Sequence, residues 1–362
     1  MSQPLQARRA PSLTTAILGF VVLSAILAAA AGWYLLTVRM TEFRQGALAE
    51  AVTVRARALE LDFARTLHQE WRNARTIADD ISRRDQNAIR SSLDLVVGDN
   101  VSVSWAGIAA LNGTVTVASD ALLEGQDVSQ RPWFQRGLEG DFAGDVHEAK
   151  LLAKLLPTQD GEPRQFLDLA TPVRDEGGAV SGVLGVHLNY AWALDHLRES
   201  AASLGIDAFL INREGAVVIA TDPAVSGSLD LPSARAAMAG VSFTGIEAWP
   251  DGAAYFTTVV PQVGYQDLPS FGWSLIARID DGAITGRPTL ATLLTIPIGF
   301  GLVLMLMTFL FIQIFTRPIG KLAESAAAVM RDEDVYPYES RTPAEAQTLS
   351  AAIARLQGRS AR

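Results

Sequence analysis

Two long apolar runs without a charged residue lie near the two ends of the chain, at residues 13–38 and 288–316. A helix through the first run would be about 39 Å long, at about 1.5 Å per residue, and would exceed the roughly 30 Å hydrocarbon core of a bilayer. The second run has a similar length and composition. The pattern therefore predicts two membrane-spanning helices, with the segment between them on the opposite side of the membrane from both ends.

The residues that flank these runs indicate the orientation. Arg8 and Arg9 precede the first run, an arrangement that cleavable signal peptides share, but the run is longer than the apolar region of such peptides. We therefore interpret it as a retained anchor. Because positive residues favour the cytoplasmic side, we expect residues 1–12 and the segment that begins at Arg317 to lie in the cytoplasm.

The pattern after the first run is helical. No Gly or Pro occurs between Gly46 and Gly98. Apolar residues recur there at steps of three or four, at Leu59, Phe63, Leu67, Trp71, Ala74, Ala78 and Ile81. This spacing predicts a long amphipathic helix, continuous with the first span, that ends or bends between Asp79 and Asn87.

Further along the chain the pattern becomes one of short strands and helices, and it repeats. In the first set, Asn112-Gly113 is a strong hairpin signal, and the predicted elements are strands at 101–111, 114–117, 165–173 and 179–189 and helices at 132–138 and 190–204. In the second set, they are strands at 208–212, 216–220, 253–260 and 273–279 and a helix at 233–238. The middle of the chain therefore reads as a long helix followed by two successive small α/β units.

Composition and motifs exclude several classes of function. The 362-residue chain has no cysteine, so disulfides, thiol catalysis and Cys-based zinc sites are ruled out. The formal charge is −9 and no long basic run occurs, so we expect no nucleic-acid partner. No nucleophile elbow, phosphate loop or metalloprotease motif is present, and no two histidines have metal-ligand spacing. We expect a protein that is not an enzyme and that has no metal and no cofactor.

Three short segments resemble the double Cache sensor family of bacterial transmembrane receptors. They are Asp-Val-Ser-Gln-Arg-Pro-Trp-Phe at 127–134, Gly-Val-Leu-Gly-Val at 182–186 and Asp-Ala-Phe-Leu-Ile-Asn-Arg-Glu-Gly at 207–215. The resemblance covers roughly residues 40–285. It implies an α+β fold in which two transmembrane helices flank a periplasmic, PAS-like double Cache module at 39–287, anchored in the bacterial inner membrane. The membrane-distal unit would span about 90–200 and the membrane-proximal unit about 205–285.

The resemblance also implies a ligand site in the distal unit. Family members that bind amino acids share an Arg-x-Trp-aromatic element, matched here by Arg131, Trp133 and Phe134. A guanidinium can hold a carboxylate through two hydrogen bonds, and aromatic walls exclude water. Those members also use an Asp and a later Tyr, and these positions fall here at His187 and near Ala149 or Lys150. The departures argue against an α-amino acid and leave a carboxylate or another small polar metabolite as the expected ligand.

Three further residues are candidates for this site, each with a structural alternative. His147 and His187 are predicted on neighbouring strands, where both could face the pocket or could be hydrogen-bonded residues of the sheet. Asp145 is an acidic candidate close to His147. Arg131 and Trp133 could equally begin a helix and fill the core.

The C-terminal segment, residues 317–362, resembles a HAMP relay. Two short amphipathic stretches are joined by a polar connector at 332–343, in which Val335 and Tyr338 are the expected packing residues. HAMP relays are helical and work as parallel four-helix bundles, which implies a homodimer.

These features together predict a transmembrane sensor that binds a small extracytoplasmic ligand and relays a conformational change to the cytoplasm. Two alternatives stay open. The chain could be a non-catalytic receptor or adaptor subunit that pairs with a separate cytoplasmic kinase or cyclase. It could also be a truncated form of a diguanylate cyclase, histidine kinase or chemoreceptor, because no such output domain fits after Leu356.

Overall fold

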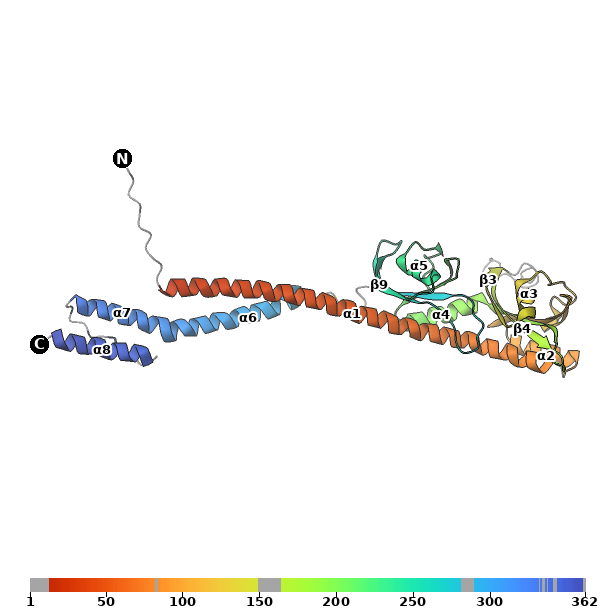
Figure 1. The fold of residues 1–362 in the computed structure, drawn as a ribbon, viewed down its shortest axis with the longest axis horizontal. Coiled ribbons are helices and arrows are strands. Elements are labelled where there is room, and N and C mark those ends of the chain that lie inside the picture. Colours follow the sequence, from red (N-terminus) through yellow and green to blue (C-terminus); the bar gives the residue numbers. More distant parts are fainter. Residues whose placement is uncertain are drawn as a thin grey trace, which may run out of the picture. The chain divides into compact units, whose positions relative to one another are not determined.

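A computed structural model describes residues 13–81, 84–148, 164–280, 290–331, 333, 336, 338–340 and 344–360. The predicted tail at residues 1–12 lies outside these residues. The chain divides into two compact units, one formed by Arg44–Thr285 and the other by Met1–Phe43 with Gly286–Arg362. Each unit is described below by itself (Figure 1).

A long helix, α1 (Leu13–Asp80), supports the unit formed by Arg44–Thr285. From residue 44 onward it runs along both sheets of that unit and buries a stripe against them that includes Leu48, Leu59 and Trp71 (Figure 1). A second helix, α2 (Gln86–Val97), follows, and the Asp85 carboxylate caps it by accepting the N–H of Ala88 at 2.8 Å. The predicted end of the long helix between Asp79 and Asn87 is therefore confirmed.

The distal sheet has five antiparallel strands in the order β2-β1-β5-β4-β3. Helices α1 and α2 cover one face, and the short helix α3 (Pro132–Glu139) packs on the other. The strands are β1 (Val103–Ala110), β2 (Val115–Ala118), β3 (Phe142–Glu148), β4 (Gln165–Arg174) and β5 (Val180–Asn189), with a single 3-10 turn, η2 (Ser119–Ala121), after β2.

The proximal sheet repeats this arrangement in the order β8-β7-β6-β11-β10-β9. Helix α4 (Tyr190–Leu204) connects the two sheets, and α5 (Pro232–Met238) packs on the proximal sheet as α3 does on the distal one. Both short helices have Pro in the first turn, where its missing N–H costs nothing. The strands are β6 (Asp207–Ile211), β7 (Ala216–Ala220), β8 (Gly227–Ser228), β9 (Phe243–Ala248), β10 (Ala254–Val260) and β11 (Ser274–Asp280).

The compact unit formed by Met1–Phe43 with Gly286–Arg362 is helical in its described part. Helix α6 (Leu290–Phe311) continues through one π-helical turn, η4 (Ile312–Thr316), into α7 (Arg317–Met330), and α8 (Ala344–Ser360) follows. Leu322 of α7 packs against Ala346 and Ile353 of α8, with Tyr338 beside them, while Val335 lies outside the described residues. Within the described residues one helical segment, Ile298–Met330, is long and apolar enough to cross a membrane, and Val21–Leu35 is a shorter apolar helix.

Candidate functional site

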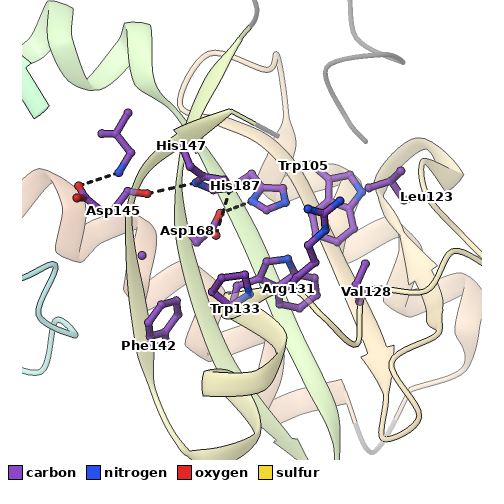
Figure 2. Close-up of a pocket in the computed structure, with 13 residues that line it drawn as sticks. Trp105, Leu123, Val128, Arg131, Trp133, Phe142, Asp145, His147, Asp168 and His187 are labelled. Atoms are coloured by element: carbon purple, nitrogen blue, oxygen red, sulfur yellow. Dashed lines mark hydrogen bonds and ion pairs between the residues drawn. The ribbon is translucent and has the colours of Figure 1, made fainter. Parts of the chain in front are cut away.

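A cavity of about 360 Å³ lies in the distal unit, at the α3 face of the sheet. Strands β1, β3, β4 and β5 supply its floor, and the start of α3 and the segment before it supply its wall. Figure 2 shows thirteen described residues that line it: Trp105, Leu123, Val128, Arg131, Pro132, Trp133, Phe142, Gly144, Asp145, Val146, His147, Asp168 and His187.

Aromatic rings form much of the cavity wall. The rings of Trp105 and Trp133 are 5.9 Å apart, and Trp105 stacks on the imidazole of His187 at 5.0 Å. Trp133 lies directly on the backbone of β5 at Gly185, where a Cβ atom would come within 2.6 Å of the indole. A glycine at this position is therefore what allows Trp133 to form the wall.

The polar centre of the cavity is an aspartate between two histidines. Asp168 of β4 and His187 of β5 are paired across the sheet, and their side chains are almost fully buried. His187 Nδ1 lies 2.5 Å from Asp168 Oδ1, and His147 Nε2 lies 3.5 Å from Asp168 Oδ2 (Figure 2). Because an ionised carboxylate only accepts hydrogen bonds, His187 carries a proton on Nδ1. Its Nε2 makes no hydrogen bond to any described residue.

Arg131 is the cation of the cavity. It is the residue before α3, where the ring of Pro132 holds the helix start, and it is half-buried. Within the described part of the chain, its guanidinium has no hydrogen bond or ion pair. Figure 2 shows the side chain reaching from the start of α3 past Val128, toward the level of Trp105 and His187. Five N–H donors are therefore available there.

Asp145 joins the cavity to the proximal unit. It lies on β3, and its carboxylate accepts the indole N–H of Trp273 at 2.8 Å and the amide N–H of Asn212 at 2.7 Å. Trp273 directly precedes β11, and Asn212 directly follows β6. A displacement of β3 would therefore be felt by the two central strands of the proximal sheet.

Five of the six predicted site residues line this one cavity: Arg131, Trp133, Asp145, His147 and His187. Phe134 does not line it. Its ring packs edge-on against Trp133, 6.1 Å away, inside the core. Ala149 and Lys150 lie outside the described residues.

One prediction about the site was wrong. His147 and His187 are not on neighbouring strands, because β4 lies between β3 and β5 and brings Asp168 between the two imidazoles. Asp168 was missed, although the alternation in β4 offered a signal. Asp168 shares a face with Phe166 and Ala170, so it is a charged residue in an otherwise apolar row.

In the proximal sheet, Arg278 occupies the position that matches His187 of the distal sheet, and other side chains bind it. Arg278 of β11 is buried and forms ion pairs with Asp207 at 2.9 Å and Asp222 at 2.6 Å. Its guanidinium lies 4.4 Å from the Trp249 ring and 4.2 Å from the Tyr255 ring. This cation is therefore satisfied by side chains of its own unit, whereas Arg131 has no such partner among the described residues.

Within the described residues, no group of three or more His, Asp or Glu side chains is arranged to hold a metal ion. The cavity is better suited to an organic molecule, with hydrogen-bonding groups at its centre and rings around them.

Comparison with known proteins gives matches to solved structures alone. No protein-family model matches the chain, and no curated protein does. Similar structures include the ligand-binding domain of the Pseudomonas aeruginosa PAO1 amino acid chemoreceptor PctB with L-Arg, at 17% identity and TM-score 0.48, over 67% of this chain and 98% of that chain. The ligand-binding domain of the Campylobacter jejuni chemoreceptor Tlp3 with L-norvaline matches at 12% identity and TM-score 0.47, over 67% and 95%.

An extracellular ligand binding receptor from Desulfohalobium retbaense DSM5692 matches at 14% identity and TM-score 0.45. The match covers 64% of this chain and 40% of that one. The three solved structures named here are thus described as ligand-binding domains of chemoreceptors or as a ligand-binding receptor.

Proposed function

We propose that this chain is a membrane-anchored sensor that binds a small organic molecule in the cavity of its distal unit. The observation that carries the proposal is that the guanidinium of Arg131 and Nε2 of His187 line one cavity walled by rings, and that neither has a partner among the described residues. Half-buried polar groups without a partner are costly unless a ligand or water satisfies them. The volume of about 360 Å³ lies in the range of small-molecule sites.

The ligand contacts in this proposal come from three elements. Arg131 and Trp133 at the start of α3, His187 on β5 and His147 on β3 contact the ligand, and Asp168 orients both imidazoles. Asp145 reports the ligand to the proximal unit through Trp273 and Asn212.

Membrane anchoring is part of the same proposal. Helix α6 exposes large apolar side chains, with Met305 at 67% and Leu302 at 61% exposure, and the first helix does so at Leu27, with 62%. Such surfaces are unfavourable in water and favourable in lipid. We assign residues 13–38 and 288–316 as the two spans, residues 39–287 as the periplasmic module of an inner-membrane protein, and residues 1–12 and 317–362 as cytoplasmic.

Relay to the cytoplasm is part of the same proposal, and the order of elements supports it. In sequence, β11 ends at Asp280 and α6 begins at Leu290, so a shift of β11 is passed along the chain toward the second span. Helices α7 and α8, which pack through Leu322 and Ile353, serve as a HAMP-like relay in a homodimer. A cytoplasmic signalling partner would read their arrangement. Cysteine cross-linking in membranes, with single cysteines introduced into α7, tests the homodimer, and monomers alone would contradict it.

Thermal unfolding of the full-length chain in lipid nanodiscs tests the ligand site. The panel contains organic acids, amino acids, amines and purines. A ligand at about 100 times its Kd should stabilise the native state by about 2.7 kcal/mol, a shift of several degrees. Arg131→Ala should abolish the shift. Arg136→Ala removes the same charge from an exposed position on α3 and should leave the shift intact. A well-folded chain that responds to no compound would refute the proposal.

A further inference from the structure

The imidazole of His147 on β3 faces an acceptor oxygen with each of its two ring nitrogens (Figure 2). Nδ1 lies 3.2 Å from the backbone carbonyl oxygen of Asp145, and Nε2 lies 3.5 Å from Oδ2 of Asp168. A neutral imidazole has one N–H donor and one lone pair, so either tautomer would point its lone pair at one of these oxygens. The imidazolium has an N–H on both nitrogens and can donate toward both acceptors.

The other imidazole of the cavity has a partner in its neutral form. His187 faces Asp168 Oδ1 through Nδ1 at 2.5 Å, and its Nε2 makes no hydrogen bond to any described residue. One N–H is therefore enough for His187, whereas the surroundings of His147 accept two. The side chain of His147 is also the more accessible, at 39% exposure against 7% for His187. Protons from solvent therefore reach His147 directly.

The charges that face His147 favour its imidazolium form. The carboxylates of Asp168 on β4 and Asp145 on β3 line the cavity, together with the guanidinium of Arg131 before α3. These three groups leave one net negative charge when both imidazoles are neutral, and one imidazolium cancels it. The other titratable neighbours are the His187 ring on β5, 6.1 Å away, and the exposed Glu148 next in sequence.

We propose that His147 is a proton-binding site, an inference that rests on the proposed function because it places a second input at the same cavity. Imidazole changes its charge between about pH 5 and 8. In acid, the imidazolium bridges the Asp145 carbonyl and the Asp168 carboxylate and so holds β3 to β4, where their pairing is irregular between Gly144 and His147. As pH rises, the ring loses one N–H and releases one of the two oxygens.

Asp145 connects this proton to the proximal unit. Its carbonyl oxygen faces His147, while its carboxylate accepts the N–H groups of Trp273 and Asn212. Because one residue makes both contacts, a change at its backbone also acts on its side chain. We therefore expect the environment of Trp273 to follow the charge of His147.

Histidine-selective nitrogen-15 labelling of the full-length chain in nanodiscs measures the proton directly by NMR, because the chain has four histidines. His147→Gln identifies the signals of His147. We expect both of its ring nitrogens to be protonated near pH 5, and only one of them to remain protonated by about pH 8.

Variants of the neighbouring charges connect this titration to the cavity. Asp168→Asn removes the counter-charge and should move the midpoint of the His147 titration about one pH unit lower. Arg131→Ala removes the opposing charge and should move the midpoint higher, which tests the same balance without changing the buried Asp168. The matched control is Asp62→Asn, which removes the carboxylate 3.1 Å from His196 and should leave His147 unchanged.

Fluorotryptophan labelling with fluorine NMR tests the connection to the proximal unit. The Trp273 signal should shift with the same midpoint as His147 and should lose this shift in His147→Gln. Trp249, whose indole N–H bonds to Thr257 within the proximal sheet, serves as the control and should not follow His147.

These measurements use no ligand, so their outcome is distinct from that of the proposed function. A single protonated nitrogen on His147 from about pH 5 to 8, or a midpoint that neither Asp168→Asn nor Arg131→Ala moves, would overturn the inference and leave the ligand site intact. A Trp273 signal that depends on pH equally in the wild type and His147→Gln would overturn the connection. If His147 titrates as described and no compound binds the chain, the ligand site falls and the proton-binding site stands.

Discussion

In the distal sheet, Trp105 of β1, His187 of β5 and Asp168 of β4 lie in one row across the strands. In the proximal sheet, the matching row is Asp207 of β6, Arg278 of β11 and Thr257 of β10. The next strand of each row also agrees, because Gly144 of β3 pairs with Asp168 and Gly245 of β9 pairs with Thr257. The two units share a strand order and place a basic residue at the same point of the central strand.

The two rows differ in what satisfies the basic residue. Arg278 is surrounded by carboxylates and rings from its own unit, so nothing is left for a ligand to bind. His187 uses one nitrogen for Asp168 and leaves the other open toward a cavity that Arg131 also lines. A repeated fold therefore need not repeat an open basic group, since Arg278 is satisfied by side chains of its own unit.

The largest predicted effect is the loss of stability when Arg278, the basic residue of the proximal row, is removed. Arg278→Ala should lower stability by about 3 kcal/mol, the low end for a broken buried pair, because Asp207 and Asp251 keep contact with water. Arg131→Ala should change stability by about 0.5 kcal/mol or less, because its guanidinium has no hydrogen bond or ion pair with the described residues. Thermal unfolding followed by tryptophan fluorescence compares the two variants. Equal destabilisation would contradict the distinction between Arg278, which is paired within its own unit, and Arg131, which has no partner among the described residues.

The next largest effect comes from a methyl group added at the wall of the distal cavity. Gly185→Ala places a methyl group against the indole of Trp133 and should cost about 2 kcal/mol while it reduces the response to ligand. The control is Gly245→Ala in β9, where the new Cβ would lie 3.3 Å from the half-buried ring of Phe243. Thermal unfolding with and without ligand measures both consequences. A Gly185→Ala chain with a normal response to ligand would show that the position of the Trp133 ring does not affect ligand binding.

A smaller effect tests the link between the two units. Trp273→Phe removes the donor to the Asp145 carboxylate and should cost about 1.5 kcal/mol, as for a hydrogen bond to a charged group. Trp249→Phe removes a matched indole N–H that bonds to Thr257 within the proximal unit, and should cost about 1 kcal/mol.

Hydrogen exchange of the two Trp variants separates stability from coupling. Ligand should protect β11 amides in the wild type and in Trp249→Phe, and should protect them less in Trp273→Phe. Equal protection in all three would mean that Asp145 does not transmit binding.

The smallest effects are differences in pH dependence at two contacts between α1 and the loop before β11. Burial raises the pKa of Glu60, whose carboxylate accepts the N–H of Gly264. The hydrogen bond from His68 lowers the pKa of Asp267. A raised carboxyl pKa gives stability that is full below the unfolded value of about 4.3 and is lost as pH rises through the folded pKa. A lowered one gives stability that is present above about 3.9 and is lost as pH falls.

The stability that each contact contributes should therefore change in opposite directions as pH rises. Glu60→Gln should gain thermal stability relative to the wild type as pH rises from 4 to 7. Asp267→Asn should be less stable than the wild type at pH 7, and the difference should shrink as pH falls toward 3. Melting temperatures across this range measure both, and parallel curves for the two variants would contradict the account.

Much of the fold was predictable because its signals are local. Asn112-Gly113 marked the hairpin of the distal unit, and the apolar spacing after Asn189 gave the bounds of α4. The repeat of strands and a Pro-initiated helix was visible as well. Strand β9 was not predicted, because it is an edge strand with Gly245 at its centre and with few buried side chains.

The site was less predictable because it depends on strand order. Nothing local to His147 or His187 says that β4 lies between them, and the role of Asp168 exists only once that order is set. Arg131 and Trp133 were candidates because they match the Arg-x-Trp-aromatic element of the resembled family, and both line the cavity. The partners of Asp145 are 67 and 128 residues away, beyond any local pattern.

We propose that, of the two described sheets, the distal one holds the ligand site, because Arg278 of the proximal sheet is already paired with Asp207 and Asp222. Calorimetric titration of the full-length wild type and Arg131→Ala with the tightest-binding compound tests it most directly. The account predicts one ligand per chain for the wild type and at least about a tenfold loss of affinity in the variant. Two ligands per chain, or an affinity that Arg131→Ala leaves unchanged, would contradict it.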